Sequence, residues 1–92
     1  MPDMTTPASE REMRLREQIA GYVEAVKLIK GWRNRDIAAA VGYTTPAQVS
    51  KVVNQKHTMG ADKLLRLERA TGLPIPDPIM TAISLPPYRL AI

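Results

Sequence analysis

Apolar side chains recur at three- and four-residue steps along much of this chain, and this spacing restricts the folds open to it. In the first third the apolar positions are Leu15, Ile19, Tyr22, Val23, Val26 and Ile29, which share one face of a helix. Phe is absent and aromatic residues are 4% of the sequence, so a core must be built mainly from aliphatic side chains and Met. That composition suits helices better than a β-sandwich, and no β-like alternation is found outside the last eight residues. We therefore predict an all-α fold, a compact five-helix bundle with a long first helix.

Capping residues and glycines predict where the helices begin and end. Ser9 and Thr45 are each followed three residues later by Glu or Gln, which is the pattern of a capping box. Gly31, Gly42 and Gly72 stand where a helix would stop, because glycine readily adopts the left-handed backbone of a helix end. The predicted helices span residues 9–30, 34–41, 45–54, 61–71 and 77–84.

The length of 92 residues fits one domain. Residues 1–8 are small, polar and interrupted by proline, so we expect a disordered lead-in. Residues 9–84 form the predicted domain. Residues 85–92 are an apolar tail without helical potential, which we interpret as a dimerisation arm or, alternatively, as a segment that folds back over its own domain.

Several classes of function are disfavoured by what the sequence lacks. There is no cysteine and His57 is the one histidine, which excludes thiolate chemistry and a histidine-rich metal site. The sequence has no Gly-rich phosphate loop and no cluster of carboxylates, so we expect no enzymatic activity, no cofactor and no metal. No apolar run approaches the ~20 residues that cross a bilayer, and the charged N-terminus lacks a signal-peptide core. We expect a cytoplasmic protein without a membrane partner.

The net charge of +4 is concentrated in the middle of the chain. Residues 27–57 carry six Lys or Arg and one Asp, a net +5, whereas residues 1–26 carry a net −2. A polyanion-binding face requires such a basic segment, because each neutralised phosphate releases condensed counterions. A solvated basic face that only keeps the protein soluble explains the same pattern equally well.

The predicted helices 34–41 and 45–54 are joined by a glycine turn, and the second has an apolar stripe of Val49, Val52 and Val53 beneath a polar outer face. Two short helices arranged in this way are typical of a helix-turn-helix. The charged start of the first helix is expected to project from the core or to pack on a partner.

A family resemblance is carried by the segments IAAAVGY at 37–43, VSKVV at 49–53 and LLRLERATG at 64–72. These segments resemble the phage-repressor/Cro-like (XRE-type) DNA-binding domains, with similarity over about residues 19–84. The resemblance implies a lambda-repressor-like domain of bacterial or phage origin that dimerises on two-fold symmetric operators and regulates transcription. The turn is one residue longer than in the family, and a frequent family glycine after the recognition helix is Gln55 here.

The resemblance and the side-chain chemistry together predict which residues contact double-stranded DNA. The predicted base contacts are Thr44, Thr45, Ala47, Gln48 and Lys51, since Gln pairs with adenine, Lys reaches guanine and a methyl group fits the thymine methyl. The predicted phosphate contacts are Lys30, Arg33, Asn34, Arg35, Ser50, Asn54, Gln55, Lys56, His57 and Thr58. Three alternatives stay open: Gln48 could serve only the capping box, Lys51 could be a solvated charge, and Asn34 could be a simple N-cap.

A homodimer is predicted from the apolar C-terminal part of the chain. Its predicted contacts are Ile79, Met80, Ile83, Leu85, Tyr88, Leu90 and Ile92. A competing class of function is a helix-turn-helix-shaped protein-interaction module, such as an antitoxin or antiactivator, and a protein co-regulator is a further expected partner. The outward face of residues 44–57 separates these hypotheses, because only a DNA-binding protein needs it for bases and phosphates.

Overall fold

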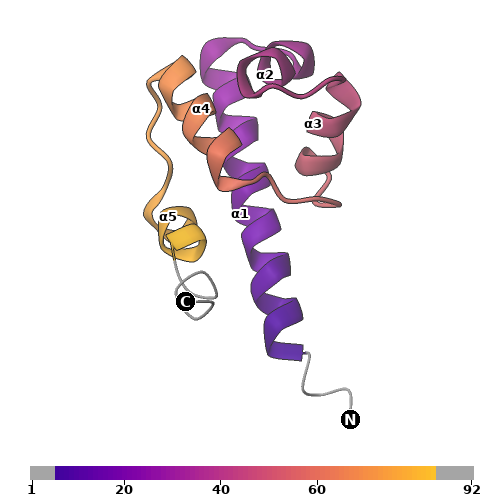
Figure 1. The fold of residues 1–92 in the computed structure, drawn as a ribbon, viewed down its shortest axis with the longest axis vertical. Helices are drawn as coiled ribbons and strands as arrows, with labels where there is room; N and C mark the ends of the chain where they lie inside the picture. Colours follow the sequence, from indigo (N-terminus) through magenta and orange to yellow (C-terminus); the bar gives the residue numbers. More distant parts are fainter. Residues whose placement is uncertain (1–5, 85–92) are drawn as a thin grey trace.

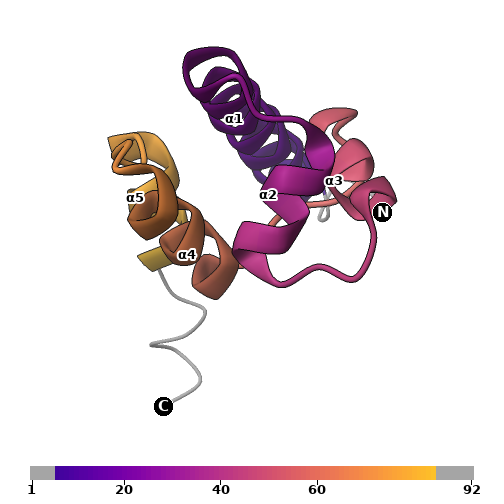
Figure 2. The ribbon, with the colours of Figure 1, turned by 90° about the horizontal axis from the view of Figure 1, so that it is seen from above.

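Five helices make up the part of the chain that the structure describes. The computed structural model describes residues 6–84, and its helices are Thr6–Lys30 (α1), Asn34–Val41 (α2), Pro46–Val53 (α3), Ala61–Thr71 (α4) and Asp77–Ser84 (α5). No strand is found among these residues, and the predicted all-α, five-helix fold is confirmed. Helix α1 runs along the long axis of the molecule, with α3 on one side of it and α5 on the other (Figure 1; Figure 2).

Most predicted helix ends agree with the structure. Helices α2 and α4 have the predicted bounds, and Gly42 and Gly72 close them with φ of 89° and 75°. Helix α3 starts at Pro46, directly after its N-cap Thr45. The proline ring fixes φ of Pro46 at a value that suits a helix. These ends depend on residues within one turn of the boundary, so the local sequence was enough to predict them.

The start of the first helix was predicted wrongly. Helix α1 begins at Thr6, three residues before the predicted capping residue Ser9, so residues 6–8 are helical rather than a disordered lead-in. Pro7 lies in the first turn, where its missing N–H removes no helical hydrogen bond. Residues 1–5 of the predicted lead-in and the whole predicted tail, 85–92, lie outside the described residues.

The core lies where α1 packs against α3 and α5 and where α2 packs against α3 and α4. Its fully buried side chains are Ile19, Val23, Val26, Ile37, Val41, Val49, Val52, Met59, Leu64, Leu67 and Ile79. The predicted inward stripe of α3 is confirmed, since Val49 and Val52 are 0% and 1% exposed and Val53 is partly buried against the core. None of the described helices has the length and apolar character needed to span a bilayer.

Two buried residues lie outside the helices. Met59 fills the core from the segment between α3 and α4, and Ile75 does so from the segment between α4 and α5. Sequence analysis missed both, because helical periodicity carries no information about which loop residue turns inward. Tyr22 of α1 contacts the segment between α4 and α5, because its Oη donates a hydrogen bond to the Leu73 carbonyl, 2.8 Å away. Burial of the ring raises the pKa of Tyr22.

Two predictions about apolar residues are corrected by their burial. Ile29 was expected on the buried face of the first helix but is 64% exposed, because it lines an open hollow between α1 and the segment after α4. Ile79 was predicted to contact a second copy, yet it is completely buried within its own chain and presents no surface to a partner. Met80 and Ile83 are partly buried and pack against the core.

Candidate nucleic-acid interface

Helix α3 has a polar face that its own chain leaves uncovered. Ala47, Lys51 and Asn54 are exposed, whereas Val49 and Val52 are buried on the opposite side of the helix. The predicted contacts just before the helix, Thr44 and Thr45, are exposed as well. The structure therefore brings most of the predicted base contacts onto one accessible surface, which we call the α3 face (residues 44, 45, 47, 51 and 54).

Gln48 has a structural role that limits what it can contact. Its Oε1 accepts hydrogen bonds from the Thr44 N–H at 2.9 Å and the Thr45 N–H at 3.2 Å, and the Thr44 hydroxyl lies at 3.2 Å. Bidentate pairing with adenine needs both the amide oxygen and the amide nitrogen of Gln. Because the oxygen is already used in the capping box, Gln48 has only its Nε2 donor left for a ligand.

The start of α2 differs from the expected cap. Arg33 occupies the N-cap position, and its backbone N–H donates to the Asp36 carboxylate at 2.8 Å. The alternative of Asn34 as N-cap is therefore wrong, since Asn34 is the first helical residue. Its Oδ1 is buried without a hydrogen-bond partner in the described part of the chain.

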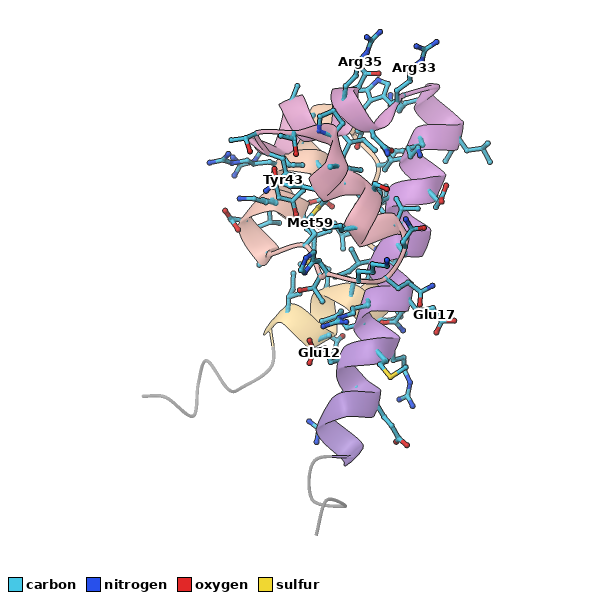
Figure 3. The ribbon with its side chains drawn as sticks, turned by 90° about the vertical axis from the view of Figure 1, so that its right-hand side faces the viewer. Glu12, Glu17, Arg33, Arg35, Tyr43 and Met59 are labelled. Atoms are coloured by element: carbon cyan, nitrogen blue, oxygen red, sulfur yellow. The ribbon has the colours of Figure 1, made fainter. Side chains whose placement is uncertain are left out.

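Three of the predicted basic contacts, Lys30, Arg33 and Arg35, lie where α1 meets α2. Arg33 and Arg35 project from the end where α1 meets α2, and Glu12 and Glu17 lie towards the opposite end of α1 (Figure 3). Both arginines are exposed, as is Lys30 at the last position of α1. These three basic residues and the two glutamates therefore lie towards opposite ends of α1, although Asp36 lies beside Arg33 (Figure 3).

The turn after α3 uses its own backbone amides to close the helix. The N–H of Gln55 donates to the Val52 carbonyl at 3.0 Å, and those of Lys56 and His57 donate to the Lys51 carbonyl at 2.8 and 3.3 Å. Gln55 has φ of 64°, a left-handed value that glycine adopts without strain. Phosphate contacts from residues 55–57 must therefore come from side chains, and those of Gln55, Lys56, His57 and Thr58 are exposed.

The N-terminus of α4 is a poorer phosphate site than the sequence suggests. Helix N-termini attract anions through free N–H groups, but Asp62 lies in the first turn of α4. Its carboxylate would repel an incoming phosphate. Burial of the Tyr43 ring raises the pKa of its phenol, and the nearby Asp62 raises it further.

A polar hollow next to α3 includes residues that the sequence analysis did not select. It is lined by Glu12 and Arg16 of α1, by Tyr43, by Gln48 and Lys51 of α3, and by His57 and Thr58. We call it the α1–α3 hollow. Nothing in the sequence pattern connects Arg16 with His57, which lies 41 residues further on, because their proximity depends on how α1 crosses α3.

Among the described residues, only some of the hydrogen-bond donors of Arg16 have an acceptor in this hollow. Its Nη2 donates to Glu12 Oε2 at 2.7 Å, one turn earlier on the same helix. Its Nε is buried and has no hydrogen-bond partner among the described residues. Both side chains remain partly solvated, with 31% of Arg16 and 55% of Glu12 exposed, and exposed pairs of this kind contribute little, about 1 kcal/mol or less.

Comparisons of this chain with protein-family models, with curated proteins and with solved structures found no match. Among the described residues, no group of three or more His, Asp or Glu side chains is placed to hold a metal ion. The support for a function therefore comes from the surfaces described above.

Proposed function

We propose that this protein is a sequence-specific transcriptional regulator that places α3 in the major groove of duplex DNA. The observation that carries the proposal is the division of α3 into a buried face, Val49 and Val52, and an exposed face, Ala47 and Lys51, which the exposed C-cap Asn54 continues. The major groove admits an α-helix whose outer side chains are small or polar. Helix α2 packs directly against α3, as the first helix of a helix-turn-helix does.

The charges on either side of α3 support the same proposal. Lys51 and Lys56 lie on α3 and in the turn after it, while Lys30, Arg33 and Arg35 lie at the junction of α1 and α2. Phosphates on both edges of a groove can be neutralised by groups placed on both flanks of the inserted helix. We further propose that the protein binds as a homodimer to two half-sites about 34 Å apart.

The hydrogen bonds of Gln48 sharpen the expected base preference. With Oε1 engaged by Thr44 and Thr45, Gln48 offers a donor alone, as Lys51 does. Guanine presents two acceptors, N7 and O6, in the major groove. We therefore propose that the half-site contains guanine opposite Gln48 and Lys51, with thymine methyls near Thr44, Thr45 or Ala47, rather than an adenine read by Gln48.

The test uses a carboxylate on the α3 face. Ala47→Glu leaves the buried valines in place but sets a negative charge against the duplex, so we expect the affinity for a duplex selected from a random pool to fall at least about tenfold. The measurement is fluorescence anisotropy, with circular dichroism as a check on folding. Ala70→Glu is the matched control, since Ala70 is exposed on α4, and its affinity should match that of the wild type. Equal loss in both variants, or no loss in Ala47→Glu, contradicts the proposal.

A protein-interaction module is the second candidate, and an apolar hollow favours it. This hollow lies between α1 and the proline-rich segment after α4, with Gly21, Ala25 and Ile29 on one side and Pro74 and Pro76 on the other. Leu28 is 86% exposed at the same end of α1. Under this candidate the wild-type chain shows no preference among duplexes, whereas selection from the random pool yields a defined site if α3 reads DNA.

A further inference from the structure

We propose that the α1–α3 hollow is a phosphate site, in which Arg16 and the hydroxyl of Thr58 bind a DNA backbone phosphate near the positive charge of Lys51. In the free protein Glu12 holds Arg16, and the phosphate replaces Glu12 when the duplex binds. This inference rests on the proposed function, because the phosphate belongs to the duplex that α3 contacts.

The position of the hollow points to a duplex phosphate. Gln48 and Lys51 line it from α3, and Lys51 belongs at the same time to the exposed α3 face. Thr58 lines it from the turn that follows α3, and Arg16 lines it from α1. Because Lys51 belongs both to the hollow and to the α3 face, a group bound in the hollow lies next to the face that we place in the groove.

The charges in the hollow favour an anion. The basic side chains of Arg16 and Lys51 line the same hollow, and Glu12 is the one carboxylate among its lining residues. The two basic groups outnumber this one carboxylate, so the hollow has an excess of positive charge that attracts an anion. A phosphate diester also accepts hydrogen bonds from the hydroxyl of Thr58 and from the imidazole of His57.

The pair between Arg16 and Glu12 has the properties of an exchangeable contact. It uses Nη2 of Arg16 alone and leaves Nε buried without an acceptor, which is an unfavourable state for a donor. The planar guanidinium can give two parallel hydrogen bonds to a phosphate, which a single contact with Glu12 does not use. Because Glu12 is more than half exposed, water can solvate its carboxylate after Arg16 leaves.

The experiment measures the salt dependence of binding to the selected duplex. A plot of log K against log salt has a negative slope, and for Arg16→Ala we expect it to become less steep by about 0.9, the loss of one phosphate contact. The affinity at low salt should fall several-fold. Arg16→Lys keeps the charge and should recover most of the slope. Glu12→Gln should bind more tightly than the wild type, because the competing carboxylate is gone. The order of preference among duplex sequences should not change in any of these variants, since a phosphate carries no sequence information.

Arg11→Ala is the matched control. Arg11 lies on the same helix and carries the same charge, but it lines a hollow beside α5, so its slope should equal that of the wild type. If Arg16→Ala and Arg11→Ala both keep the wild-type slope, or if Glu12→Gln binds more weakly, the phosphate site is wrong while the proposed function stands. If the wild-type chain binds no duplex, both the proposed function and the phosphate site are wrong.

Discussion

Gly42 is a single residue on which the geometry of the α2–α3 turn depends. Its φ is 89°, and a Cβ at this position would lie 2.7 Å from Nη1 of Arg66, the atom that donates to the Val41 carbonyl. We expect Gly42→Ala to lower the free energy of unfolding by about 1–2 kcal/mol, through left-handed strain and displacement of Arg66. Urea unfolding followed by circular dichroism measures this. Gly21→Ala is the control with opposite sign: Gly21 lies inside α1 with no atom near its missing Cβ, and alanine there should add about 0.5–1 kcal/mol.

Tyr22 makes stability depend on pH at the alkaline end. Burial is the main cause that raises the pKa of its phenol above the ordinary value of about 10, so the unfolded chain loses this proton at a lower pH than the folded one. The contribution is fully present below about pH 10 and is lost as the pH rises through the raised pKa. Urea unfolding at a series of alkaline pH values should show this decline, and Tyr22→Phe should make it shallower. The pKa of Tyr43 is raised as well, so part of the decline should remain. A decline equally steep in Tyr22→Phe contradicts this assignment.

At the scale of elements, Met59 determines where the turn after α3 lies. It is 2% exposed and packs into the core from the segment that also holds His57 and Thr58. We expect Met59→Ala to lower the free energy of unfolding by about 2–5 kcal/mol, since it removes a long buried side chain. Met13→Ala is the control, because Met13 is 65% exposed and its loss should change stability by less than about 0.5 kcal/mol. Denaturant unfolding of the two variants side by side checks the prediction, and similar values for both contradict it.

The relation between α1 and α3 also belongs to the scale of elements. The first third of the chain carries a net −2, and a surface of that sign repels DNA. The structure nevertheless places Arg16 and Glu12 of this acidic region beside Lys51. Under the proposed function, Arg16 of α1 adds one positive charge to the binding surface. Glu17 lies towards the end of α1 opposite Arg33 and Arg35 (Figure 3). We therefore expect a duplex to be bound more strongly at the end of the molecule that carries Arg33.

At the scale of the whole molecule, the predicted homodimer loses part of its expected interface. Ile79 is excluded as a contact by its burial, and Met80 and Ile83 are already packed on their own core. The remaining predicted contacts are in residues 85–92. We expect sedimentation equilibrium to give twice the 10.2 kDa mass of one chain, and deletion of residues 85–92 to give a single chain. If the protein remains a dimer after the deletion, the tail is not the dimer interface, and the exposed Leu28 and Ile29 become the candidate contacts.

The helices were predictable because each depends on residues close together in sequence. Gly42 and Gly72 end α2 and α4 as expected, and the stripe of Val49 and Val52 is buried as its spacing indicated. The α3 face followed from that stripe, since the residues opposite a buried stripe are exposed. The sequence also raised both possible roles of Gln48, but only the positions of the Thr44 and Thr45 amides show that its oxygen is engaged.

Tertiary packing decided what local pattern leaves open. Ile29 shares the periodicity of Val26 but not its burial, because it lines the open hollow between α1 and the segment after α4. Met59 is buried although no pattern marks it. The α1–α3 hollow joins residues from four separate segments, so it exists only once α1 and α3 are packed together. Periodicity, caps and turn residues act within about one helical turn and so specify the helices and their apolar sides. Which side chains from distant segments meet depends on the angles at which those helices pack, and these angles are a property of the assembled core.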